Sequence, residues 1–165
     1  MIIARLDVDA RSAVLRAATE EARSCGSRTL EAEHLLLALA CEPGDAAQLL
    51  DAHDLGVDAL RTALDREQAS SLASVGIEIG DYEPSTAPSP HRDTPRLATS
   101  TKRALQRAAV EARNRRDRRI TSLHLLIGVL DTDIGTVPRM FEIADVRHSV
   151  LIAEARSLLD DGRPR

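Results

Sequence analysis

Apolar residues recur at helical spacing along most of this chain. Val14, Ala18 and Ala22 lie four positions apart, with Leu15 beside the first of them. This spacing places the apolar side chains on one face of an α-helix. Gly26 then predicts the end of the first helix, because glycine readily adopts the left-handed conformation that often follows one.

Two further stretches, residues 35–41 and 123–130, are apolar at nearly every position. A helix that is apolar all round has to be surrounded by other elements. The sequence therefore predicts two central helices. The turns and spacings that follow predict short third helices at residues 46–52 and 137–143, and fourth helices at 57–67 and 146–159. Asp9 is expected to cap the first helix, and Ser100 or a neighbour to begin its counterpart.

The two halves of the sequence match at an offset of 90 positions. Glu21-Ala22-Arg23 recurs as Glu111-Ala112-Arg113, and His34-Leu35-Leu36 recurs as His124-Leu125-Leu126. A shared motif pair at one offset indicates a tandem duplication. We predict an all-α fold, a duplicated four-helix unit with eight helices and a pseudo-two-fold axis. Residues 1–69 would form the first repeat, 70–96 a linker rich in Ser, Pro and Gly, and 97–161 the second repeat, the two packing as one domain.

The composition narrows the class of protein. Only one Phe and one Tyr occur in 165 residues, with no Trp, although 43% of the chain is hydrophobic. This disfavours all-β folds and base-stacking platforms for single-stranded nucleic acid. No apolar run approaches the roughly 20 residues of a membrane span, and no secretory signal begins the chain, so we expect a cytoplasmic protein. Cys25 and Cys41 lack metal-site spacing and are interpreted as free, buried thiols.

Charge divides the chain into an acidic and a basic half. Residues 1–69 carry a net charge of −6, residues 70–95 carry −3, and residues 96–165 carry +5. Such halves either attract each other or present two different faces.

The duplicated motif resembles the N-terminal domain of the Clp ATPases. Residues 20–23 read Glu-Glu-Ala-Arg, and residues 32–39 read Ala-Glu-His-Leu-Leu-Leu-Ala-Leu, with a second copy of the latter at 122–129. The resemblance covers about residues 5–160. It implies a Clp N-terminal-domain-like fold and a module that receives substrates and adaptor proteins rather than a catalyst.

A phosphate-binding loop needs a Gly-rich turn that ends in Gly-Lys-Ser/Thr. The one lysine, Lys102, follows Thr101 and no such turn. We therefore expect a stand-alone, non-enzymatic domain without the ATPase modules, with no cofactor and no metal. His34 and His124 each stand at the entrance of a predicted central helix, where an imidazole can satisfy backbone groups. No third ligand or nucleophile lies near either of them in sequence.

The resemblance also implies an apolar groove where the starts of the two first helices meet. The positions that match the family's groove phenylalanines are approximately Ile3, Leu6 and Leu97. We therefore expect an aliphatic, shallower groove for a peptide or protein, with a different ligand preference.

Glu33 matches a glutamate that contacts phosphorylated arginine in some relatives. The threonines that assist it there are replaced by about Val8 and Ala98, and the second glutamate by Leu123. One pocket is thus half intact and the other is lost. The alternative interpretation is that Glu33 stabilises a helix N-terminus.

Five arginines fall within seven residues of the predicted loop between the fifth and sixth helices: Arg113, Arg115, Arg116, Arg118 and Arg119. The pattern favours a solvated loop or contact of Arg115, Arg116, Arg118 and Arg119 with an acidic protein partner.

Together these features predict a protein- or peptide-binding module of Clp proteolysis that acts as an accessory factor, adaptor or decoy. Its partners would be a Clp ATPase, adaptors or substrates, and no membrane partner is expected. Two alternatives stay open. One is sequestration of a cyclic peptide antibiotic that targets the Clp ATPase, and the other is a nucleic-acid-binding regulator that uses residues 113–119.

Overall fold

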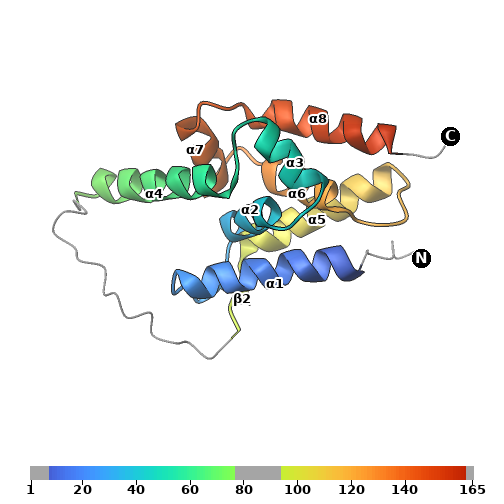
Figure 1. Cartoon of the computed structure of the whole chain (residues 1–165). Helices are drawn as coiled ribbons and strands as arrows, with labels where there is room; N and C mark the ends of the chain where they lie inside the picture. The colour runs from blue at the N-terminus through green and yellow to red at the C-terminus, as the bar shows by residue number, and fades with distance from the viewer. Residues whose placement is uncertain (1–7, 77–93, 163–165) are drawn as a thin grey trace.

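The computed structural model describes residues 8–76 and 94–162, with side chains from residue 12 onward. These residues form eight α-helices and one short parallel strand pair, which confirms the all-α prediction (Figure 1). The helices are α1 (Val8–Ser24), α2 (Ala32–Cys41), α3 (Asp45–Ala52), α4 (Val57–Ser74), α5 (Thr99–Asn114), α6 (Ser122–Leu130), α7 (Thr136–Ile143) and α8 (His148–Asp161). The strands are β1 (Thr29–Leu30) and β2 (Arg96–Leu97).

The apolar helices α2 and α6 lie at the centre, as their sequences predict. Every residue of α6 from Leu123 to Leu130 is buried, and so is α2 from His34 to Leu39. Helix α1 packs on α2, α5 packs on α6, and the two central helices contact each other. One core of Leu, Ala, Ile and Val therefore runs through both repeats.

The outer helices pack across the two repeats. Helix α4 of the first repeat lies against α7 of the second, and α3 lies against α8. Helices α3 and α7 are equivalent in the two repeats, and so are α4 and α8. A pseudo-two-fold axis that exchanges equivalent helices therefore converts the α4–α7 pair into the α8–α3 pair. The repeats are thus interlocked rather than placed side by side.

Strand β1 directly precedes α2, and strand β2 directly precedes α5. The strand pair therefore joins the start of α2 in the first repeat to the start of α5 in the second. Thr29 pairs with Arg96 and Leu30 with Leu97 in parallel register. The buried Thr101 hydroxyl donates a hydrogen bond of 2.6 Å to the Leu30 carbonyl. Strands of two residues are too short to show an alternating pattern, so the sequence did not predict them.

Three local expectations were wrong. Helix α1 begins at Val8, so Asp9 lies within its first turn instead of capping it. Helix α4 continues to Ser74, seven residues beyond the expected end, because Gln, Ala and Leu favour helix there. Cys25 and Cys41 are free but exposed, since both lie at helix ends on the surface.

Candidate functional site

Each histidine of the repeated motif closes the N-terminus of its central helix. The Nδ1 atom of His34 accepts a hydrogen bond of 3.0 Å from the Glu31 backbone N–H. In the second repeat, Nδ1 of His124 accepts one of 3.1 Å from the Thr121 backbone N–H. Each forms a capping box with histidine at the third helical position. This is the structural role predicted for both histidines.

The hydrogen bonds at Nδ1 fix the proton of each neutral ring on Nε2. The Nε2 atom of His34 lies 3.3 Å from Cys25 Sγ, and the Nε2 atom of His124 lies 3.1 Å from Asp117 Oδ2. Burial is the main cause that lowers the pKa of both rings, although Asp117 opposes it at His124. Both rings are therefore held neutral as capping groups.

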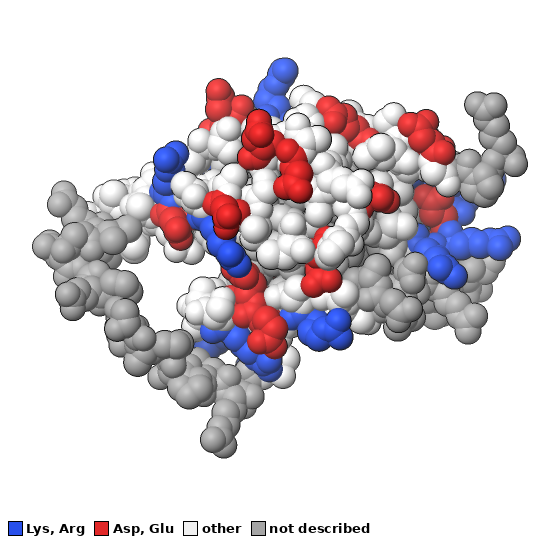
Figure 2. Space-filling model, viewed as in Figure 1, with Lys and Arg blue, Asp and Glu red and all other residues white. Residues whose placement is uncertain are grey.

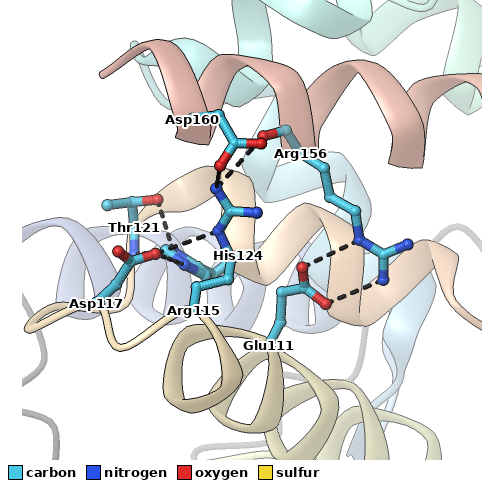
Figure 3. Close-up of polar contacts among 7 residues, drawn as sticks. All are labelled: Glu111, Arg115, Asp117, Thr121, His124, Arg156 and Asp160. Carbon is cyan, nitrogen blue, oxygen red and sulfur yellow. Dashed lines mark hydrogen bonds and ion pairs between the residues drawn. The ribbon is translucent and has the colours of Figure 1, made fainter. Parts of the chain in front are cut away.

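The arginine-rich loop divides into an inward residue and outward residues. The Arg115 side chain is only 13% exposed, and it lies 3.3 Å from Asp117 Oδ2 and 2.6 Å from Asp160 Oδ1 (Figure 3). It therefore braces the loop against α8. Arg116, Arg118 and Arg119 are exposed, and contact of this loop with an acidic partner stays a prediction.

Arg116 adopts a left-handed backbone conformation, with φ of 61°. Its counterpart 90 positions earlier is Gly26, with φ of 72°. The same helix-terminating turn thus closes the first helix of each repeat. The second repeat uses a non-glycine residue there, at some conformational cost.

Glu33 lies in the first turn of α2, close to the contact between α4 and α7. Burial raises the pKa of its carboxyl, a hydrogen bond from its own backbone N–H lowers it, and the neighbouring carboxylates of Glu31 and Glu67 raise it. Arg139 on α7 is the cation that lowers it. Three carboxylates (Glu31, Glu33 and Glu67) and one guanidinium group therefore form a charged cluster here.

The sequence pattern did not single out the buried acid of that cluster, Glu67 on α4. Its side chain is 5% exposed, and its Oε1 accepts a hydrogen bond of 2.6 Å from Arg139 Nε and one of 2.8 Å from the Ser71 hydroxyl. Glu67 falls seven residues after Leu60 and three after Leu64, on the apolar face of α4. That position was the signal that could have revealed it.

Of the expected apolar groove, the structure describes Leu97, which is 42% exposed on β2. Ile3 and Leu6 lie outside the described residues. Ser100, at the start of α5, accepts a hydrogen bond of 3.1 Å from the Ala32 backbone N–H. Leu97 therefore lies at a fixed junction between the beginnings of α2 and α5.

None of the described helices is both long and apolar enough to cross a membrane.

Three solved structures have similar folds. The N-terminal domain of the caseinolytic-protease-associated chaperone ClpD from Arabidopsis thaliana is 21% identical, with a TM-score of 0.69 and 97% of each chain covered. A protein from a study of a malarial protein secretion system is 19% identical, with a TM-score of 0.65 and coverage of 90% of this chain and 91% of that one. The Hsp104 N-terminal domain from Candida albicans is 19% identical, with a TM-score of 0.60 and coverage of 98% and 95%.

At these identities the structures establish the fold alone, and no curated protein gives a significant sequence match. The family assignment comes from the sequence model of the Clp repeat N-terminal domain, which matches residues 9–142. That match spans both histidine caps, both central helices and the interlocking helices α4 and α7. The chain therefore belongs to the Clp repeat N-terminal domain family.

Proposed function

We propose that this chain is a non-enzymatic protein- or peptide-binding module of the Clp proteolysis system. It would act as an accessory factor, adaptor or decoy for the substrates or adaptors of a Clp ATPase. The observation that carries the proposal is the family match over residues 9–142. The 165 residues contain no phosphate-binding loop, which supports a role in binding rather than in ATP hydrolysis.

The junction at Leu97 supports an apolar contact for a partner. Leu97 remains 42% exposed although the backbone N–H groups of its neighbours Arg96 and Ala98 donate hydrogen bonds of 3.0 Å to the carbonyls of Arg28 and Leu30 in the β1 segment. A rigid backbone that presents an exposed leucine loses little conformational entropy when a partner covers it.

The carboxylate-rich cluster at Glu33 supports a contact with a guanidinium group of a partner. A carboxylate can accept two hydrogen bonds from a guanidinium, and Glu31 and Glu67 add negative charge nearby. We include binding of a modified or unmodified arginine at Glu33 in the proposal. The replacement of the second glutamate by Leu123, which is buried, restricts such a contact to the first repeat.

Affinity capture from a lysate of the source cells tests the proposal. The tagged full chain should recover a Clp ATPase, its adaptors or its substrates, identified by mass spectrometry. Leu97→Asp should reduce recovery, because it places a charge in the apolar contact. Glu33→Gln should selectively reduce recovery of partners bound through arginine.

Leu72→Asp is the matched control, since Leu72 is 39% exposed on the far part of α4. Recovery of no Clp component by the folded wild-type protein would contradict the proposal. Equal losses for Leu97→Asp and Leu72→Asp would contradict the assignment of the contact to the Leu97 junction.

A further inference from the structure

A cavity of about 360 Å³ opens beside α5 and α8, away from Leu97 and Glu33. Its walls include Arg103, Arg107, Val110 and Glu111 of α5, Asp131 after α6, and Arg156 of α8. Helices α5 and α8 each pack on α6. Figure 3 shows Glu111 and Arg156 reaching toward each other between α5 and α8.

The charges in this cavity are only partly balanced. Glu111 and Arg156 satisfy each other through two hydrogen bonds of 3.0 Å. Arg103 and Arg107 form no ion pair within the described parts of the chain. Burial and the neighbouring Arg103 lower the pKa of Arg107, and Asp131 opposes them. Two guanidinium groups one helical turn apart therefore repel each other beside an open cavity.

Arg107 is held in place by the fold. Its Nε donates a hydrogen bond of 2.9 Å to the carbonyl of Gly128, in the last turn of α6. A cation at this position compensates the negative end of the helix dipole. Arg107 is one of the residues that line the cavity, and Arg103, which also lines it, is exposed.

The basic lining is particular to the second repeat. The residues 90 positions before Arg103 and Arg107 are Ala13 and Ala17. Lys102 and Arg113 are also exposed on α5, and Arg116 and Arg118 follow it. Among the described residues, no helix of the first repeat carries such a concentration of cations. On the face viewed in Figure 2, acidic side chains lie over α3 of the first repeat and also over α8 of the second.

The mixture of groups distinguishes between anionic partners. Val110 is 43% exposed at the cavity, which suits an apolar side chain. Asp131 can accept hydrogen bonds from peptide N–H groups, which a sugar-phosphate backbone lacks. An acidic peptide supplies carboxylates, backbone N–H groups and apolar side chains together, and a nucleic-acid backbone supplies mainly phosphates.

We propose that the cavity beside α5 and α8 binds an acidic peptide segment, with its carboxylates at Arg103 and Arg107 and an apolar residue against Val110. The inference rests on the proposed function as a peptide-binding module. It assigns to that module a third contact, separate from the Leu97 junction and the Glu33 cluster.

Fluorescence anisotropy with a labelled ten-residue peptide of glutamates around a central leucine tests the site. The full chain should bind this peptide at low salt and less tightly as salt rises. Arg103→Glu should weaken binding by at least about threefold, because it replaces an attraction by a repulsion. Gln106→Lys adds a cation to the cavity wall and should tighten binding.

Arg16→Glu is the matched control, because it changes the net charge by the same amount as Arg103→Glu. Arg16 is exposed on α1, at the position of the first repeat that is equivalent to Gln106. Thermal unfolding confirms that each variant is folded. Absence of binding, or equal weakening by Arg103→Glu and Arg16→Glu, would overturn the site. Preferential binding of a single-stranded DNA oligonucleotide would overturn the assignment to a peptide.

Affinity capture separates failure of this site from failure of the proposed function. If wild type and Arg103→Glu recover the same Clp components in equal amounts, and the peptide does not bind, the proposed cavity contact fails while the module stands. If the wild type recovers no Clp component, the module itself fails.

Discussion

His34 and His124 perform the same backbone-capping role with different partners for the second ring nitrogen. The first faces a thiol and the second a carboxylate. The shared hydrogen bond at Nδ1 explains why histidine occupies both positions. The different partners of Nε2, a thiol in one repeat and a carboxylate in the other, show that the two repeats have diverged around a common motif.

These caps predict that the protein loses stability in mild acid. Burial lowers the pKa of both histidines below the ordinary 6.5, so the unfolded state binds more protons between that value and the folded pKa values. The stability from neutral caps is thus fully present above pH 6.5 and is lost as pH falls through the folded pKa values. Thermal unfolding between pH 8 and pH 5 should show this loss.

Asparagine can imitate the acceptor at Nδ1 without titrating. His124→Asn should therefore lower the melting temperature at pH 8, because it loses the contact with Asp117, and it should flatten the dependence on pH. A slope identical to that of the wild type would show that the caps do not cause the acid sensitivity.

The histidine caps could be predicted because each histidine directly precedes a run of apolar residues, and this arrangement occurs in both copies of the motif. Arg115 was harder to place, because its partner Asp160 lies 45 positions away and reaches it only through the packing of α8 on α6. Local sequence indicates a charged loop, but not which of its arginines points inward.

At the scale of elements, one glycine sets the distance between α5 and α6. A Cβ atom on Gly128 would lie 2.8 Å from the Ala108 backbone nitrogen and closer still to the Ala104 carbonyl oxygen. The matching residue of the first repeat is Ala38, so α1 and α2 do not need this close approach. The residues on both sides of the α5–α6 contact are accordingly small.

Gly128→Ala should therefore destabilise the protein, even though alanine favours helix. The backbone of α5 would have to move, which typically costs about 1–3 kcal/mol. Denaturant unfolding measures the change. Gly44→Ala is the control, because the nearest atom to its added Cβ is the Ser122 hydroxyl at 3.5 Å. Equal stability of the two variants would contradict a steric role for Gly128.

The order and approximate bounds of the helices followed from apolar spacing, because each helix has one buried face or is wholly buried. The β1–β2 pair and the last turns of α4 did not follow, since both depend on contacts or propensities that leave no periodic pattern. The assignment of Leu97 to a groove came from the resemblance and stays a prediction, whereas the contacts around Leu97 came from the fold.

At the scale of the whole molecule, most of the described ion pairs join residues of the same half of the chain. Basic residues of the second half pair within it, as Arg115 does with Asp160 and Arg156 with Glu111. Among the ion pairs described, Arg139 with Glu67 joins a cation of the second half to an acid of the first, and His53 with Glu154 joins the halves in the opposite sense. The sequence left open whether the halves attract each other or present two faces, and the described ion pairs show only limited pairing between them.

The Glu67–Arg139 pair predicts an asymmetric response to substitution. Arg139→Ala would leave a buried carboxylate without its cation and should cost on the order of 2–3 kcal/mol. Glu67→Gln would leave Arg139, which is 50% exposed, in contact with water and should cost less. Denaturant unfolding of both variants checks the order, and a larger loss for Glu67→Gln would contradict it.

The exchange of outer helices between the repeats has a consequence for how the fold can have arisen. Because α4 meets α7 and α3 meets α8 in a reciprocal arrangement, two identical single-repeat chains can form the same contacts as a homodimer. Joining the two copies in one chain makes their association independent of protein concentration. It also frees each copy to change alone, which permits Arg103 where the other has Ala13 and Gly128 where the other has Ala38.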